Sequence, residues 1–501
     1  MAEAAAIAVT LGIEETSPGS RSAQRLSERL RALPGVRRLS ITDSPDGGVV
    51  LLFPRHDSAF AEMLPIARLL REARDYLPVF LFATPESRPR IEDCAADGFS
   101  YIEIDPVSPQ DRVLRGHGTI AGALHIPALR RRLRADRDRL GRLIATLDPF
   151  FLGVPGDREL GPGPPLLHAA RARNLVSMIV SPAFPSTDSE GKKRAEPRRF
   201  RARIVDGAPL INHFVAKRLP KQVCETAFGP RLFTPGWLTL ALFQEDMLSE
   251  RPWHQGGGQS AYLMVHGEEQ AERFRRLGCR PEKIKVFGHM EHDLLHDAWR
   301  ARAALRAELF ERHTLEPGRP LVVFAVPSYA EQNLMPMARH LETLEGYGAA
   351  LRDSGANVVL SLHPKSRPDD YRGFAERHDF VLERERLFRL LPAADLFVSA
   401  GSTTIDWAIL CGVPVVDIDY AQLNIDLWDD EPAVAQAKTL PAFREALEGA
   451  LSDPDRLQDL AAIQRDRSAR LARFDGKVAE RFLAFLDEVH ARHRSAREAA
   501  P

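Results

Sequence analysis

The chain has 501 residues, which is too long for a single hydrophobic core and indicates two large domains. Hydrophobic residues make up 44% of it and charged residues 27%, so a wholly disordered chain is excluded. Lys and Arg number 68 against 69 for Asp and Glu, and the formal charge of −1 offers no general attraction for nucleic acid. We therefore expect no nucleic-acid partner and look for function in local sites.

The cysteines and the N-terminus indicate in which cellular compartment the protein is expected. The 4 cysteines are far apart and form no Cys-x-x-Cys pair, which fits a reducing compartment and gives no zinc signature. Glu3 stands where a signal peptide would carry positive charge, and no stretch approaches the roughly 18 apolar residues of a membrane span. We expect a cytoplasmic protein, in which any membrane contact is peripheral and at the inner face of the membrane.

The first half of the chain alternates between strand and helix patterns. Apolar runs predict strands at 49–53, 78–83, 100–104, 150–154, 176–180, 262–266 and 283–287. Helical spacing occupies segments between them, at 59–70, 91–97, 166–173 and 268–277. This alternation is typical of a parallel sheet with crossover helices, so the first domain is predicted to be α/β.

Two segments of the first half leave alternatives open. Apolar residues from Ile126 to Leu147 share one helix face and arginines occupy the rest, which predicts a long basic amphipathic helix. Its arginines either form a solvated face or attract an anionic membrane or a lipid-phosphate acceptor. Residues 182–199 are rich in Pro, Ser, Lys and Arg and predict a mobile loop, which is either functional or disordered.

The second half has the clearer pattern. Pro317 and Gly318 precede a new strand and mark the expected domain boundary. Strands are predicted at 321–326, 357–362, 380–382, 396–399 and 413–418, with helices at 334–352, 386–391 and 404–411. This pattern indicates a doubly wound sheet.

The first candidate binding loop holds His363 and Lys365 and follows a predicted strand. Ligands bind at the carboxyl ends of the strands in open α/β sheets, so both cationic groups are expected where they can neutralise a phosphate or bond a base or ribose. The alternative is that His363 only caps the strand by a hydrogen bond.

The second candidate loop, from Ser399 to Thr404, joins a strand to a helix. It contains Gly401, Ser402 and Thr403, whose backbone N–H groups and hydroxyls at the positive end of a helix suit a diphosphate. The alternative is ordinary N-capping of the helix by Ser402 or Thr403. A third loop, which follows Gly412, is expected to bring Asp417, Asp419 and Tyr420 to the same edge.

The order of these motifs resembles a known superfamily. The segments that carry the resemblance are His363-Pro364, Ala393 to Ser399, Gly401 to Thr404, Asp406 to Ala408 and Gly412 to Val415. They look like the C-terminal domain of glycosyltransferase-B proteins. Within that superfamily the chain is similar to CDP-glycerol glycerophosphotransferases and related capsule transferases, and to the non-hydrolysing UDP-N-acetylglucosamine 2-epimerases. Segments 265–268, 275–293 and 474–477 also resemble both groups, and the likeness spans about residues 49–105 and 260–490.

The resemblance implies two Rossmann-like doubly wound domains around a cleft. Residues 1–48 are then an N-terminal extension, 49–316 an acceptor domain and 317–480 a nucleotide-sugar domain, and the helix at 481–501 returns to the first domain. The implied reaction is metal-independent and needs no cofactor. It moves a sugar or polyol group from a nucleotide-activated donor to a surface polysaccharide or another glycan or lipid-linked acceptor.

The donor residues carried over are His363, Lys365, Ser399, Gly401, Ser402, Thr403, Thr404 and Asp406. Two positions depart from the family patterns. Trp407 stands where many transferases and the epimerases place a ribose-binding glutamate, while Asp406 agrees better with the glycerophosphotransferases. The paired serines of that family are Gly401 and Ser402 here, so the residues carry over only at the level of motifs. On the balance of these positions we favour a transferase over an epimerase.

The general base is expected in the first domain, because the acceptor must lie opposite the donor. His56 and Asp57 follow the first strand and are the preferred candidates. The alternative is that Asp57 or Ser58 only caps the following helix and that His56 is a surface residue. Asp157 and Glu159 are second candidates. A further set, His289, His292 and Asp293, either contacts a substrate or consists of exposed linker residues.

Two other classes of function share this fold. A sugar-nucleotide epimerase would remove and return a proton on the donor and would need no acceptor. A non-catalytic nucleotide-sugar-binding protein would hold the donor without consuming it.

Overall fold

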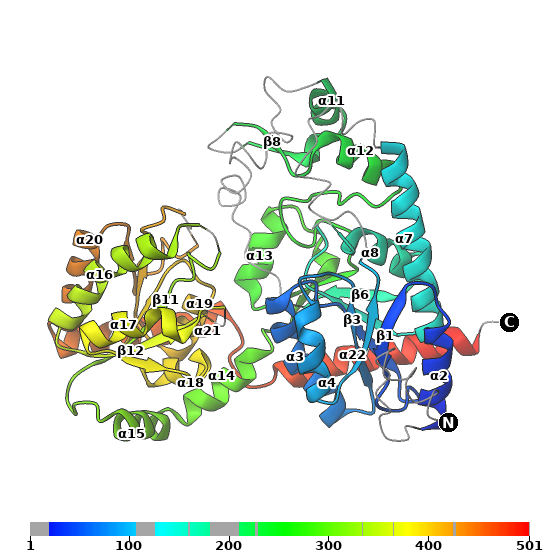
Figure 1. The fold of residues 1–501 in the computed structure, drawn as a ribbon. Helices are drawn as coiled ribbons and strands as arrows, with labels where there is room; N and C mark the ends of the chain where they lie inside the picture. The colour runs from blue at the N-terminus through cyan, green and yellow to red at the C-terminus, as the bar shows by residue number, and fades with distance from the viewer. Residues whose placement is uncertain are drawn as a thin grey trace, which may run out of the picture.

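The computed structural model describes residues 20–106, 126–158, 161–180, 210–225, 229–332, 334–363, 365–423 and 427–499. The loop predicted at 182–199 and the candidate Glu159 lie outside these residues. The described chain forms two lobes, each built around a mainly parallel sheet (Figure 1). The α/β prediction with two doubly wound sheets is confirmed.

The first sheet has eight strands in the order β1-β4-β3-β2-β5-β6-β9-β10. The strands are β1 (Val36–Ser40), β2 (Val49–Leu52), β3 (Leu77–Phe82), β4 (Ser100–Ile104), β5 (Phe151–Val154), β6 (Val176–Ile179), β9 (Tyr262–Val265) and β10 (Ile284–Val286). All neighbours are parallel except β1, which pairs antiparallel with β4 at the edge. Strands β2 and β5 are neighbours at the centre, and the strand order departs from them in opposite directions.

The second sheet has six parallel strands in the order β13-β12-β11-β14-β15-β16. They are β11 (Leu321–Val326), β12 (Asn357–Leu362), β13 (Val381–Glu383), β14 (Leu396–Ser399), β15 (Val415–Ile418) and β16 (Val434–Ala437). Here the order reverses between β11 and β14. Because ligands of open α/β sheets bind where the strand order reverses, each sheet has one expected binding crevice.

Helices cover both sheets. Those of the first half are α2 (Arg21–Arg31), α3 (Asp57–Ala73), α4 (Ile91–Ala96), α7 (Ile126–Leu147), α8 (Gly163–Arg171), α11 (Leu210–Arg218), α12 (Gly236–Gln244) and α13 (Glu268–Arg276). Those of the second half are α14 (Glu291–Arg300), α15 (Arg302–His313), α16 (Met337–Asp353), α17 (Pro368–His378), α18 (Leu387–Leu390), α19 (Thr404–Cys411), α20 (Leu440–Leu451), α21 (Pro454–Leu471) and α22 (Val478–Glu498). A short pair, β7 (Val223–Cys224) and β8 (Arg231–Leu232), lies beside α11 and α12 (Figure 1).

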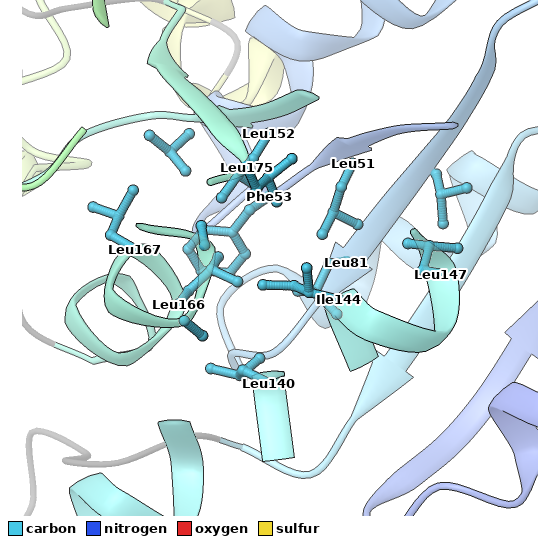
Figure 2. Packing of buried hydrophobic residues seen from close by; sticks show 14 of the residues in the cluster. Leu51, Phe53, Leu81, Leu140, Ile144, Leu147, Leu152, Leu166, Leu167 and Leu175 are labelled. Carbon is cyan, nitrogen blue, oxygen red and sulfur yellow. The ribbon is translucent and has the colours of Figure 1, made fainter. Parts of the chain in front are cut away.

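The core of the first lobe forms where apolar helix faces meet the central strands. Figure 2 shows Leu140 and Ile144 of α7 and Leu166 of α8 packing toward Leu51 of β2 and Leu152 of β5. Burying a leucine side chain stabilises the fold by about 1.5–3 kcal/mol. The amphipathic pattern predicted for 126–147 is therefore used to build the core.

The last helix, α22, crosses back under the first lobe and packs on it (Figure 1). Its first turn is capped by Asp293, whose carboxylate accepts hydrogen bonds from the backbone N–H groups of Val478 at 2.9 Å and Ala479 at 2.8 Å. Gly288 has φ +106°, and a Cβ there would meet the Val478 side chain at 2.5 Å. This close approach explains why a glycine precedes the linker.

The N-terminal part of the described chain joins the first sheet. Residues before the predicted domain start at 49 supply α2 and the edge strand β1. The division of the chain into domains stays a prediction. Among the described residues no helix is both long enough and apolar enough to span a membrane.

Candidate functional site

The crevice of the first sheet contains the predicted base candidates. Their loop follows β2, next to the loop that follows β5. His56 is the N-cap of α3, and its Nδ1 lies 3.2 Å from the backbone nitrogen of Ala59 and 2.9 Å from the Ser58 hydroxyl. The alternative that Asp57 or Ser58 caps α3 is therefore wrong, because the His56 imidazole is the cap.

This cap determines which nitrogen of His56 carries the proton. A backbone N–H only donates, so the Nδ1 that faces Ala59 must be unprotonated, and the neutral ring carries its proton on Nε2. Burial lowers the pKa of His56, and the nearby charges of Arg55 and Lys365 lower it further. In this conformation His56 is a neutral side chain that offers an Nε2–H donor.

Asp57 forms a two-pronged ion pair with Arg90, in which Arg90 Nη2 lies 2.7 Å from Asp57 Oδ2 and Nε contacts Oδ1. This hydrogen bonding is the main reason that the pKa of Asp57 is lowered, and Lys365 adds to the effect. Asp57 is therefore an ionised carboxylate that binds a proton weakly. The roles of His56 and Asp57 as general bases stay predictions.

Lys365 connects the two predicted halves of the site. It lies in the loop after β12 of the second sheet, and its charge acts on both His56 and Asp57 of the first domain. The carboxyl edges of the two sheets therefore approach each other at these loops. The structure brings together His56, Asp57 and Lys365, which are more than 300 positions apart in the sequence.

His363 in the same loop has the tautomer found at His56. The backbone N–H of Lys365 lies 3.1 Å from His363 Nδ1, so the neutral ring carries its proton on Nε2. Burial, and then the charge of Lys365, lower the pKa of His363. The loop thus presents an N–H donor and an exposed ammonium group, both suited to an anionic oxygen.

The crevice of the second sheet holds the predicted phosphate loop between β14 and α19. Gly401 has φ +53°, and its N–H donates to Asp417 Oδ1 at 2.7 Å. Burial raises the pKa of Asp417 to about 7, although the bond from Gly401 opposes this effect. Asp417, which the sequence analysis expected only near this edge, holds the shape of the loop.

The hydroxyls of the loop are partly engaged. The Ser402 hydroxyl accepts from the backbone N–H of Thr404 at 3.3 Å and from its hydroxyl at 2.9 Å. Thr403 is exposed and makes no capping bond with its side chain. The Ser399 hydroxyl is 1% exposed and has no hydrogen-bond partner among the residues that the structure describes. Thr403 and Ser399 are thus the hydroxyls with spare capacity.

Asp406 lies in the first turn of α19, directly after this loop, and its backbone N–H donates to the carbonyl of Thr403 at 3.2 Å. It is buried, accepts a hydrogen bond from Trp428 Nε1 at 2.8 Å, and has its pKa raised to about 6 by burial. Its surroundings form a small cavity between the domains, to which His266 and Arg273 of the first domain contribute. The role of Asp406 in binding the donor stays a prediction.

The interface around this cavity is ionic. Arg467 of α21 binds Glu431 at 2.6 Å and also contacts Glu269 of α13, while Arg273 Nη2 donates to the carbonyl of Leu427 at 2.9 Å. These contacts join α13 of the first domain to the second domain.

A cluster of three histidines was not predicted. The ring centroids of His266, His289 and His292 lie 5.1 to 5.7 Å from one another, at the carboxyl ends of β9 and β10. The interpretation as exposed linker residues is wrong for His292, which is 1% exposed, and Asp293 caps α22. In the described ranges no three His, Cys, Asp or Glu side chains are arranged to hold a metal ion.

Tyr329 was also missed. It follows β11, the strand beside β14, so it lies at the crevice of the second sheet. Its hydroxyl is buried without a hydrogen-bond partner in the described part of the chain, and its ring stacks edge-on against Tyr420 at 5.0 Å. The sequence contained a signal for Tyr329, because it follows a predicted strand and such residues lie at the carboxyl edge of a parallel sheet. The strand order was not known from the sequence, so this loop could not be distinguished from the other loops at that edge.

The second base candidate, Asp157, has a structural role. Its carboxylate accepts from the backbone N–H groups of Gly256 at 3.0 Å and Gly258 at 2.9 Å, and from the Ser260 hydroxyl at 2.7 Å. Buried Lys283 donates to the carbonyls of the same two glycines at 3.0 and 2.8 Å. Asp157 and Lys283 together hold the loop that contains Gly256 and Gly258 in place.

No protein-family model matches the chain, and no curated protein matches it. Several solved structures are similar. The UDP-GlcNAc 2-epimerase from Methanocaldococcus jannaschii is 13% identical, over 88% of this chain and 99% of that chain, with a TM-score of 0.46. The spinosyn forosaminyltransferase SpnP is 15% identical over 89% and 99% of the two chains, with a TM-score of 0.47. The wall teichoic acid polymerase TagF is 10% identical over 90% of each chain, with a TM-score of 0.46.

The similar structures thus include a UDP-GlcNAc 2-epimerase, a wall teichoic acid polymerase and a forosaminyltransferase. At identities of 10 to 15% and TM-scores of 0.46 and 0.47, these likenesses carry no argument about function. We therefore argue function from the residues of the chain itself.

Proposed function

We propose that the chain is a glycosyltransferase or a glycerophosphotransferase-like enzyme. It moves a sugar or polyol group from a nucleotide-activated donor to a glycan or lipid-linked acceptor, such as a surface polysaccharide, without a metal ion. The observation that carries the proposal is the approach of Lys365, on the donor side, to His56 and Asp57, on the acceptor side. The donor and the acceptor can then meet between the two carboxyl edges.

The donor phosphates are proposed to lie at the crevice of the second sheet. The Ser399–Thr404 loop lies at the N-terminus of α19, where the helix dipole favours an anion, and the exposed Thr403 hydroxyl makes no capping bond. The ammonium of Lys365 and the Nε2–H of His363 add positive charge and a donor. These groups can stabilise the negative charge that develops on the leaving nucleotide as its bond to the transferred group breaks.

The acceptor hydroxyl attacks the donor from the side of the first domain, and its proton must pass to a base. His56 can take that proton on Nε2 only if its ring changes tautomer and releases the cap on Ala59. While it caps α3, His56 instead donates Nε2–H to an oxygen of the donor or acceptor. Asp57 keeps its charge but is held by Arg90, so a proton transfer to Asp57 would weaken that pair.

We propose a cytoplasmic site for this reaction. All 4 cysteines are free thiols, and Cys94, Cys279 and Cys411 are buried, which suits a reducing compartment. A location at the inner face of the membrane stays a prediction, and fractionation of cells that produce the protein would test it.

The first experiment is a thermal-shift panel of CDP-, CMP-, UDP- and GDP-linked donors. Each stabilising donor is then incubated with and without glycan acceptors, and the products are identified by mass spectrometry. We expect nucleotide release that depends on an acceptor and is lost in Lys365→Ala and Ser402→Ala/Thr403→Ala. Arg367→Ala, which removes an exposed cation two positions from Lys365, is the matched control.

Two outcomes would replace the proposal. An isomerised donor formed without any acceptor would identify an epimerase, and tight binding with no turnover would identify a nucleotide-sugar-binding protein. Failure of every donor to bind would reject the nucleotide-sugar site itself.

A further inference from the structure

A second hollow lies on the opposite side of the first domain. It is a groove of about 850 Å³ lined by Gly48 and Val49, where β2 begins, and by Phe150, just before β5. These residues mark the amino edge of the sheet, whereas the candidate site lies at the carboxyl edge. The groove is therefore separate from the proposed donor and acceptor crevices.

Two helices line the groove, and α2 supplies a row of positive charge to it. Helix α2 contributes Arg21, Arg25 and Arg29, which are four positions apart and so share one helix face. The end of α22 contributes Arg494, Arg497, His493 and His490, and burial and then the charge of Arg494 lower the pKa of His490, which favours its neutral form. Figure 1 shows α2 beside the C-terminal part of α22.

The two arginines of α22 are paired: Arg494 Nη2 lies 4.0 Å from Glu498 Oε1, and Arg497 binds Asp148. Asp46 and Asp148 are the carboxylates that line the groove. Asp148 binds Arg497 at 2.8 Å and lies 3.6 Å from His493 Nε2, while Asp46 accepts from the Ser22 hydroxyl at 3.1 Å. The three arginines of α2 have no ion-pair partner within the described ranges, and all are exposed. The lining is thus cationic beyond what its own carboxylates balance.

The basic helix α7 provides a contrast. Arg130 and Arg134 bind Glu245 at 2.6 and 2.7 Å, and Arg139 binds Asp136 at 3.0 Å. Four of the seven arginines of α7 are therefore paired, and the exposed Arg131, Arg132 and Arg142 lie outside the groove.

We propose that the groove binds a linear acidic polysaccharide. The inference rests on the proposed function for the nature of the polymer, which would be the acceptor chain at a distance from its reacting end. Guanidinium groups match carboxylate and phosphate oxygens with paired N–H donors. Four residues of helix advance by roughly 6 Å, so the arginines of α2 form a ladder that suits an anion repeated along a chain.

The shape of the groove favours this ligand over two others. A bilayer presents a broad flat surface, whereas these side chains line a hollow whose volume is in the range of ligand sites, about 300–1,000 Å³. Single-stranded nucleic acid binds by stacking bases on exposed aromatic rings. The aromatic ring that lines the groove, Phe150, is 2% exposed and packs against His490 at 4.6 Å.

The test measures binding of the full chain to oligogalacturonate by calorimetry, beside neutral dextran of the same length. The groove variant is Arg25→Ala/Arg29→Ala/Arg494→Ala. The charge-matched control is Arg131→Ala/Arg132→Ala/Arg142→Ala, three exposed arginines of α7 outside the groove. We expect the affinity for oligogalacturonate to fall by about tenfold or more in the groove variant and less than about twofold in the control.

Several results would overturn the proposal. These are equal losses in the two variants, an unchanged affinity in the groove variant, or no binding of the polymer by the wild-type chain. Tighter groove-dependent binding of single-stranded DNA, or of phosphatidylglycerol vesicles, would assign the groove to another class of partner. A loss of binding in a groove variant that has also lost its thermal transition is not counted, so the single variants Arg25→Ala and Arg494→Ala are measured in parallel.

The two proposals fail separately. Lys365→Ala should lose donor turnover and keep polymer binding, whereas the groove variant should keep turnover of short neutral acceptors and raise the KM for long acidic ones. Groove-dependent binding without any donor turnover would reject the transferase alone.

Discussion

Replacing Asp417 by asparagine tests how the phosphate loop is held. Asp417 is 2% exposed, and burial raises its pKa from 3.8 to about 7 while it accepts the Gly401 N–H. The unfolded chain releases this proton near pH 4, and the folded chain keeps it until about pH 7. Between those values stability falls as the pH rises, because the unfolded state binds fewer protons than the folded state.

The size of the effect follows from the shift. Three pKa units at about 1.4 kcal/mol each amount to roughly 4 kcal/mol of lost stability above pH 7, as an order of magnitude. Asp417→Asn cannot ionise, and its amide oxygen can still accept from Gly401. We expect the variant to match the wild type at pH 4 and to be more stable at pH 8 by up to a few kcal/mol.

The assay is urea unfolding of both proteins at intervals from pH 4 to pH 8. Only the difference between them is interpreted, since other groups titrate in the same range. Asp459→Asn, at an exposed position, is the control for the loss of one carboxylate. A difference between Asp417→Asn and the wild type that stays constant with pH would refute the reasoning.

Three further predictions concern His56, Asp57 and the last helix, α22. His56→Ala should lose about 1 kcal/mol of stability with the α3 cap, whereas His56→Asn, which can still cap, should lose little. Both should lose transfer activity by roughly 10²–10⁴-fold if the imidazole acts on substrate, and an active His56→Asn enzyme would leave it only a capping role. Initial rates of the Asp57→Asn and Arg90→Ala enzymes show whether Asp57 is a general base or only the ion-pair partner of Arg90. A larger loss of activity in Asp57→Asn is expected for a base, whereas equal losses of activity would mean that Asp57 acts through Arg90. Asp293→Ala leaves two N–H groups of α22 without their acceptor and should lower thermal stability by about 1 kcal/mol, with Asp293→Asn in between; an unchanged melting temperature would contradict this.

The secondary structure of both domains was largely readable from periodicity. The helix predicted from Ile126 to Leu147 has those bounds in α7, and the strand predicted at 321–326 is β11. Long amphipathic helices and short buried strands carry a strong signal because one side of each element must be apolar. The edge strand β1 was missed because its sequence, VRRLS, is only partly buried and shows no continuous apolar run.

The candidate site was predicted in part. Residues that follow strands were recognised at His56, His363 and Gly401, because the carboxyl edge of a parallel sheet is the expected place for a ligand. The direction of each side chain was not readable. Asp406 stands one turn from the phosphate loop in the sequence, yet its carboxylate faces Trp428 at the domain interface.

The sequence by itself determined the α/β class, the positions of most elements and the loops from which a ligand site could be built, because these depend on local patterns of apolar and small residues. Only the tertiary structure decided which strands are neighbours, and hence that Tyr329 shares a crevice with the Gly401 loop. It also decided that Lys365 lies close enough to His56 for its charge to lower the pKa of that imidazole, and that α2 and α22 line one groove. Strand order and domain packing arise from contacts between residues hundreds of positions apart, which leave no periodic trace in one sequence.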